Sequence, residues 1–181
     1  MRHSSVPALV PLVTSGNVTD HVEYNATNYP SAALIAIEEH GSWHAMSAAV
    51  FRDEVRAVAK GLIADGIAAG DRVAIFSRTR HEWTIADYAI WYAGAITVPI
   101  YETSSAEQVQ WIMQDSNVVA TFFEAQRTLY PFREIQSTVP HMAHEYIFTD
   151  GGLEELKSRG AQVSDLDLDN RRSIALPSDM A

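Results

Sequence analysis

Residues 72–100 read RVAIFSRTRHEWTIADYAIWYAGAITVPI, and this run alternates between two kinds of hydrophobic pattern. Residues 72–77 and 95–100 are short apolar runs, which predict buried strands. Residues 81–93 are apolar on nearly every side, which indicates a buried helix. Thr79 is its expected N-cap, and Gly94 is where it should end. A strand, a helix and a second strand in this order predict a βαβ unit with parallel strands.

The alternation continues on the N-terminal side of this unit. Apolar residues recur at steps of three and four in the segment that follows Ser47, which predicts a helix that stops at Gly66. They are Phe51, Val55, Val58 and Leu62. Before this helix, residues 33–38 and 43–46 are expected to pair as a short hairpin around a turn at 40–42. One more helix is expected near 18–26.

The C-terminal side repeats the same alternation. Ser104 and Glu107 match a capping box, which predicts a helix through Asp115. Next come an expected strand over 118–123 and a short helix that begins at Pro131. The remaining expected elements are a strand over 145–149 and helices over 153–158 and 164–172. The whole pattern predicts an α/β fold, a parallel-rich sheet with helices on both faces, preceded by the short hairpin.

The composition excludes several classes of function. The net charge of −10 at pH 7 disfavours a nucleic-acid partner, because neutralising phosphates requires clustered Lys and Arg. The chain has no cysteine, which excludes disulfides, a thiolate nucleophile and Cys-based zinc sites. Its longest apolar run, residues 88–101, is shorter than the roughly 20 residues that span a bilayer. Pro7 and Pro11 interrupt the N-terminal apolar residues, so no signal peptide is predicted and a cytoplasmic location is expected.

The sequence contains no complete catalytic motif. It has neither a Gly-rich phosphate loop nor a Gly-x-Ser-x-Gly nucleophile elbow. Two histidine pairs, 40/44 and 141/144, lack the third ligand of a zinc site and are interpreted as surface positions. The acidic run 164–169 lacks the central Gly and the closing Glu of a calcium loop, which favours a solvated helix start.

Polar residues gather where two of the predicted strands end, at 77–80 and 101–104. In open α/β sheets, ligands bind beyond the carboxyl ends of the strands. Arg78 and Arg80 have the donors to hold a phosphate or a carboxylate. The favoured interpretation is instead that Arg80 pairs with Glu82 or Glu102 and locks the loop. For Tyr101, Thr103 and Ser104, turn or capping roles and contact with a substrate fit equally well.

The segment GLIADGIAAGDRVAI, residues 61–75, resembles the adenylate-forming superfamily, in which a helix leads through a Gly turn into a Gly-Asp-Arg-Val strand. The continuation is more specific: RHEW (80–83), ADYAI (86–90), Gly94, VPIYETSS (98–105), AEQV (106–109) and DS (115–116). These motifs are similar to the long-chain fatty acyl-CoA synthetase branch, where Arg-x-x-Trp and Pro-Ile-Tyr-x-Thr recur. The similarity covers about 32–181.

The resemblance implies part of an ATP-dependent long-chain fatty acid:CoA ligase, which forms an acyl-adenylate and then a CoA thioester. It implies ATP, Mg and CoA as cofactors of the full-length enzyme and a fatty acid as substrate. Residues 177–181 are similar to the stretch directly before the family's phosphate loop. The chain is therefore expected to be an N-terminal fragment, with an arm over 1–31 and a partial α/β domain over 32–181.

The family's catalytic motifs have no counterpart in this chain, so no catalytic residue carries over. The resemblance suggests roles near the acyl-binding side for Arg80, Trp83, Tyr101 and Thr103. The fragment alone is expected to be inactive and to bind no cofactor, and contact with membranes is expected to be peripheral at most. Two alternatives stay open: a non-catalytic α/β binding or interaction module, and a ligase for medium-chain or aryl acids.

Overall fold

The computed structural model describes residue 6, residues 9–10 and residues 14–179. Most of the segment 1–13, on which the signal-peptide prediction rests, lies outside the described residues, as do Met180 and Ala181 at the end of the stretch 177–181. The elements in chain order are α1 (Asp20–Asn28), β1 (Ala33–Glu39), β2 (Ser42–Ser47), α2 (Ala48–Ala64), β3 (Arg72–Phe76), α3 (His81–Tyr92), β4 (Ile96–Ile100), α4 (Ala106–Ser116), β5 (Val118–Phe123), α5 (Leu129–Ile135), β6 (His144–Ile147), α6 (Gly152–Gly160) and α7 (Asp165–Arg172). Short 3₁₀ turns flank α5 and follow β6.

Four strands form one parallel sheet in the order β4-β3-β5-β6. Val73 of β3 lies opposite Thr97 of β4 on one side and Ala120 of β5 on the other. The chain therefore moves from β3 to one neighbour and then crosses back over β3 to the other. This reversal of strand order is a topological switch point, and it lies between β3 and β5.

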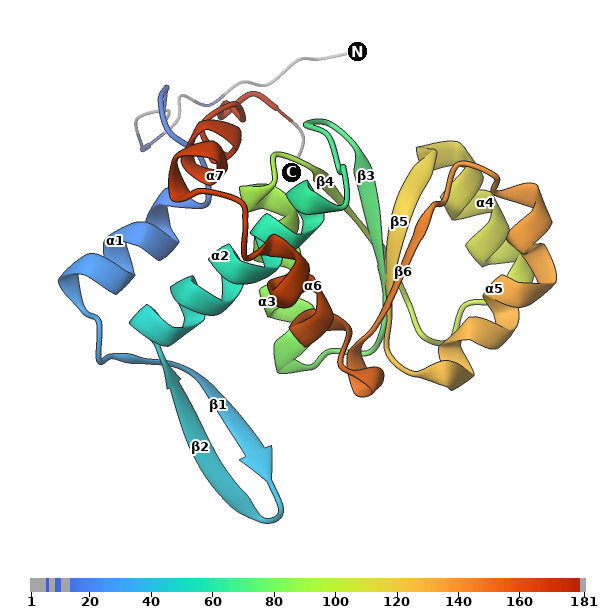
Figure 1. The fold of residues 1–181 in the computed structure, drawn as a ribbon, viewed down its shortest axis with the longest axis horizontal. Helices are drawn as coiled ribbons and strands as arrows, with labels where there is room; N and C mark the ends of the chain where they lie inside the picture. Colours follow the sequence, from blue (N-terminus) through green and yellow to red (C-terminus); the bar gives the residue numbers. More distant parts are fainter. Residues whose placement is uncertain (1–5, 7–8, 11–13, 180–181) are drawn as a thin grey trace.

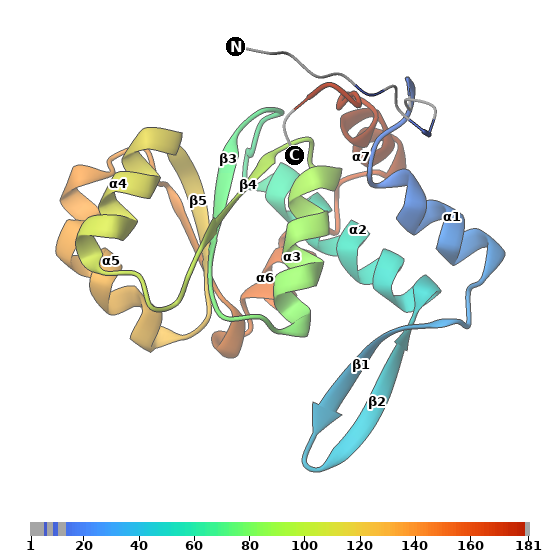
Figure 2. The same cartoon turned by 180° about the vertical axis from the view of Figure 1, so that it is seen from behind.

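Helices cover both faces of the sheet, as the sequence predicts (Figures 1 and 2). Strand β3 shows why, since its side chains alternate between two fully buried sets. Val73 and Ile75 face the core beneath α2, α3 and α6, whereas Ala74 and Phe76 face the core beneath α4 and α5. A strand without a polar face needs helices on both sides, which confirms the predicted α/β class.

The hairpin is confirmed as well, with β1 and β2 pairing antiparallel and Ala36 opposite Ala45. The turn is made by His40 and Gly41, both at positive φ. The ribbon projects from the body at the end of the molecule where α3 and α6 begin (Figure 1).

Pro99 disfavours the pairing of a further strand with the free edge of β4. Ile96 donates its backbone N–H to the Asp71 carbonyl, toward β3, at 2.8 Å. Because backbone groups alternate in direction along a strand, Pro99 then faces the open side, where its missing N–H removes a donor that another strand would need.

Two predicted N-cap residues are wrong by one position, although the helix predicted from residue 81 does begin at His81. The N-cap of α3 is Arg80, whose backbone is extended, and not Thr79; no side chain caps this end. The acidic Glu82 in the first turn stabilises it instead. The capping box of α4 is real, but Ser105 and Gln108 form it in place of Ser104 and Glu107.

Two element boundaries in the second half of the chain, the end of β6 and the start of α5, also differ from prediction. Strand β6 ends at Ile147, before the predicted Thr149, because Phe148 begins a 3₁₀ turn that Gly151 closes at positive φ. Helix α5 begins at Leu129, so Pro131 lies within its first turn, where no intrahelical partner for its nitrogen is required.

Helices α2 and α6 cross with their backbones in contact. A Cβ atom at position 61 would overlap the carbonyl oxygen of Leu156, and one at position 160 would overlap the backbone nitrogen of Gly61. Gly61, Leu156 and Gly160 are all buried. Only glycine at 61 and 160 therefore permits this crossing.

A cluster around Arg56 of α2 binds the two ends of the described chain to the body. Its Nη1 lies 2.8 Å from Glu23 of α1 and 2.8 Å from Asp169 of α7. Its Nη2 lies 3.1 Å from Asp165, which also pairs with Lys60 at 2.9 Å. The predicted solvated helix start at 164–169 is confirmed, because the Ser164 side chain caps α7.

Gly61→Ala is expected to destabilise the protein. In an open helix this change raises the free energy of unfolding by up to about 1 kcal/mol. Here the added methyl group overlaps the Leu156 carbonyl, so we expect a loss of about 1–3 kcal/mol in chemical denaturation. Ser158→Ala, at an exposed position of α6, is the control and should cause no loss. Equal effects of the two changes would contradict the close crossing.

Candidate functional site

The carboxyl ends of β3 and β5 meet at the switch point, which is where open α/β sheets bind ligands. Buried Ser77 follows β3, and buried Glu124 follows β5. The two strand ends are joined directly, because Glu124 donates its backbone N–H to the Phe76 carbonyl at 3.1 Å. Polar groups are thus fixed at this edge by the sheet itself.

Glu124 is a buried carboxylate held between two arginines. Its side chain is 2% exposed, whereas those of Arg78 and Arg127 are 61% and 63% exposed. Arg78 pairs with it twice, through Nε at 3.1 Å and through the backbone N–H at 3.2 Å. Arg127 pairs with the same carboxylate from the following turn.

This cluster carries one more positive than negative charge, and its guanidinium groups face solvent. It could therefore accept a phosphate or carboxylate group without losing its internal ion pairs. The sequence analysis named Arg78 but missed Glu124 and Arg127. The available signal was a carboxylate directly after the apolar run 118–123, at a strand end where a charge is expected only if it is paired.

Arg80 does not join this cluster but forms a separate lock. Its Nε lies 2.7 Å from Glu82 Oε2 and its Nη2 lies 2.5 Å from Oε1. Its guanidinium also lies 5.8 Å from the ring centroid of Phe148. The loop-locking interpretation therefore holds, with Glu82 as the partner in place of Glu102.

Burial and ion pairing act in opposite directions on this pair. Burial alone would raise the pKa of Glu82, but the hydrogen bond from Arg80, its own backbone N–H and nearby His81 hold that pKa below its ordinary value. The hydrogen bond to Glu82 in turn raises the pKa of Arg80. Both groups are charged at neutral pH, so the pair acts as a fixed ionic clasp.

The other predicted site residues also lie at the carboxyl edge. Trp83, in the first turn of α3, is half-buried and packs against the core. Tyr101 and Thr103 follow β4 and are exposed, Tyr101 at 82%. Among the described residues, no side-chain hydrogen bond joins these three to Arg80 or to one another. The fold brings all four to one edge without forming a single cluster.

No metal site is assembled in the described part of the chain, where no three His, Asp or Glu side chains gather in a suitable arrangement. His40 and His44 are exposed on the hairpin, and His144 stacks on Tyr146 with ring centroids 6.2 Å apart. Across residues 6, 9–10 and 14–179, no helix combines the length and apolarity needed to cross a membrane.

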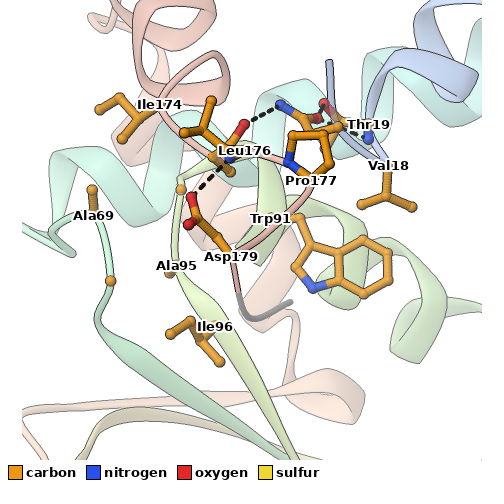
Figure 3. A pocket seen from close by; sticks show the side chains of 14 residues that line it. Val18, Thr19, Ala69, Trp91, Ala95, Ile96, Ile174, Leu176, Pro177 and Asp179 are labelled. Carbon is orange, nitrogen blue, oxygen red and sulfur yellow. Dashed lines mark hydrogen bonds between the residues drawn. The ribbon is translucent and has the colours of Figure 1, made fainter. Parts of the chain in front are cut away.

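A cavity of about 460 Å³ lies at the opposite edge of the sheet (Figure 3). It lies between the start of β4, Trp91 of α3 and the two terminal segments of the described chain. Among the described residues that line it, Asp179 alone is charged, and it accepts a hydrogen bond from the Leu176 N–H at 2.8 Å. The described lining offers no cationic side chain to a phosphate, whereas the carboxyl edge has two exposed guanidinium groups and is the better candidate.

Arg80→Gln should reverse the pKa shift of Glu82. In the wild type, a lowered pKa means that this carboxylate contributes stability above its unfolded-state pKa, and that the contribution is lost as pH falls through the folded-state pKa. Without Arg80, burial should dominate and raise the pKa of Glu82 above its ordinary value. The measurement is an NMR titration of the carboxyl carbon. Arg133→Gln, which disrupts the remote pair with Glu145, should leave that titration unchanged.

Glu124→Gln should destabilise the protein because it leaves two guanidinium groups beside a neutral amide. Hydrogen bonds to charged groups contribute about 1.5–3 kcal/mol, so we expect a loss of about 2 kcal/mol in the free energy of unfolding. Glu134→Gln, at an exposed position of α5, is the matched control and should have little effect. A loss of the same size in both variants would refute a stabilising role of the cluster.

Comparison with known proteins agrees with the motifs found in the sequence. The family model for the AMP-binding enzyme matches residues 22–181. The long-chain-fatty-acid--CoA ligase FadD15 of Mycobacterium bovis is 39% identical over 184 residues, covering 100% of this chain and 31% of that protein. FadD15 of Mycobacterium tuberculosis is 38% identical with the same coverage. The chain thus spans about 31% of the length of these curated relatives.

The solved structures agree on the fold. A long-chain-fatty-acid-CoA ligase (FadD1) from Archaeoglobus fulgidus superposes with a TM-score of 0.73 at 16% identity, over 82% of this chain and 31% of that chain. At this identity the likeness concerns the fold alone. The family match over most of the chain, together with the whole-chain identity to the curated relatives, confirms the resemblance first seen in residues 61–75 and 80–109: the chain belongs to the AMP-binding enzyme family.

Proposed function

We propose that this chain is part of an ATP-dependent long-chain fatty acid:CoA ligase. In such a reaction a fatty acid carboxylate attacks the α-phosphate of ATP to form an acyl-adenylate, and CoA thiolate then displaces AMP. The observation that carries the proposal is the 39% identity to a long-chain ligase over the entire chain. Because the chain spans 31% of that relative, the activity is assigned to a longer protein that contains it.

Within that protein we assign the chain a scaffolding role without catalytic residues. We divide it into an arm over 1–31 and a partial α/β domain over 32–181, and place Arg80, Trp83, Tyr101 and Thr103 near the acyl-binding side. Support comes from their common position at the carboxyl edge of the sheet. The Arg80–Glu82 clasp would hold the start of α3 rigid beside the substrate.

ATP, Mg and CoA belong to the longer protein in this proposal, and ATP supplies the activation of the carboxylate. The exposed guanidinium groups of Arg78 and Arg127 fit an anionic cofactor that approaches the carboxyl edge. The described residues gather no three carboxylate or His ligands, so we assign no Mg ligand to them. We place the protein in the cytoplasm, in peripheral contact with membranes at most, which the charge and composition support.

ATP–pyrophosphate exchange across acids of different structure tests the proposal. The longer protein should exchange with long-chain fatty acids, whereas the 181-residue chain alone should show none. Exchange only with medium-chain or aryl acids would replace the long-chain assignment by that substrate class. No exchange with any acid, for a folded longer protein, would favour a binding module in its place.

A further inference from the structure

Helices α1 and α7 lie next to each other in both views of the fold (Figures 1 and 2). With the adjoining loops they make a terminal strap, residues 17–28 and 165–179. Their share of the hydrophobic core is small, since α1 buries Val22 and Ala26 and α7 buries Leu168, whereas α2 alone buries seven residues. Helices of nine and eight residues are too short to be stable alone in water. Both therefore depend on polar contacts with the body of the molecule.

Arg56 of α2 provides contacts to both helices at once. Its guanidinium group lies 2.8 Å from the carboxylate of Glu23 in α1. The same group lies 2.8 Å from Asp169 and 3.1 Å from Asp165, both in α7. If either helix leaves, this half-buried cation loses part of its compensating charge, so each helix supports the other through Arg56.

Arg172 joins the two parts of the strap directly. Its Nη1 lies 2.5 Å from the carboxylate of Asp20 and 3.0 Å from the hydroxyl of Thr19. In return, Asn17 donates its side-chain N–H groups to the carbonyl oxygens of Arg172, at 2.9 Å, and of Ala175, at 3.2 Å. These bonds connect segments that are 155 positions apart in the sequence. Neither segment can leave the body without breaking bonds to the other.

The closed arrangement is also imperfectly satisfied at Arg172. Its side chain is 19% exposed, and in the described part of the chain its Nε is buried without a hydrogen-bond partner. Water would bond this group if the strap opened, so the unpaired donor favours the open arrangement. Elements with few buried apolar contacts are also the ones that open locally while the rest of a domain stays folded.

The strap forms much of the cavity of about 460 Å³ at the edge of the sheet opposite the candidate site (Figure 3). More than half of the described lining residues come from its segments 17–19 and 174–179. The body contributes the remainder, which includes Trp91 of α3 and Ala95 before β4. Ala95 is only 4% exposed while the strap is in place. Removal of the strap would take away these walls and open the cavity to water.

We propose that the terminal strap is a gate over this cavity. Helices α1 and α7 leave the body together while the sheet stays folded, and the cavity exists only when they are in place. Ion pairs control the opening, because they make up most of the contact that must be broken. This inference does not rest on the proposed function, and none of its tests measures catalysis.

Amide hydrogen exchange tests whether the two helices open as a unit. In Arg172→Gln, exchange should become several-fold faster in α1 and α7 alike and should not change in β3 and β5. Arg133→Gln removes the remote pair with Glu145 and is the matched control, which should leave all four elements unchanged. Faster exchange in α7 alone would overturn the proposal. So would unchanged exchange in both helices, or an equal increase in every element.

A single introduced thiol tests access to the cavity, because the chain has no cysteine of its own. Ala95→Cys places the thiol in the cavity wall, and Ala120→Cys places it at a fully buried position of β5 as the control. Reaction of Ala95→Cys with the thiol reagent DTNB should become several-fold faster when Arg172→Gln is added. It should also become faster as NaCl rises from about 0.1 M to about 1 M, because the Debye length falls from about 10 Å to about 3 Å.

Ala120→Cys should stay unreactive under all of these conditions. Equal rates at the two positions would overturn the proposal in favour of global unfolding. A rate at position 95 that neither Arg172→Gln nor salt changes would overturn it as well, because the ion pairs would then not control access.

Discussion

The backbone contact between α2 and α6 is the constraint on which the C-terminal third of the structure depends. Because Gly61 and Gly160 have no side chains, α6 can lie close enough to α2 for Leu156 to be fully buried. The chain then enters α7, whose Leu168 is also buried and whose acidic side chains reach Arg56. Side chains at either glycine would separate the helices and expose this layer of the core to water.

The candidate site follows from the way the sheet is covered. Helices must lie on both faces because β3 buries side chains on both, and the connections from β3 and β5 therefore leave in opposite directions. Glu124 lies at the carboxyl end of β5, between these departing loops. A buried carboxylate requires compensating charge, and the arginines that provide it come from the two diverging loops. The ion pairs therefore hold the loops together at the switch point.

Local patterns in the sequence predicted most of the fold, but they could not predict contacts between distant segments. The strands at 72–77 and 95–100 and the helix between them depend on periodicity within a few residues. Glu124 and Arg78 are 46 positions apart, so their pairing depends on the strand order, which periodicity does not specify. The shifts from Thr79 to Arg80 and from Ser104 to Ser105 have another cause. Ser104 and Ser105 are equally suitable caps by type, whereas Arg80 provides no side-chain cap, and in both loops the backbone geometry sets the position of the N-cap.

The two ends of the sheet differ in the groups that they can offer to a ligand. The amino end has a cavity of about 460 Å³, but the described residues of its lining offer one negative charge and no cation, which does not suit an anionic ligand. The carboxyl end has exposed guanidinium groups, the rigid Arg80–Glu82 clasp and the projecting ribbon. The described residues of this end contain no assembled nucleophile or metal site. They can therefore attract and position an anionic ligand, but they supply no group that reacts with it. A surface that attracts anions but cannot react with them becomes useful only when reacting groups are brought to it.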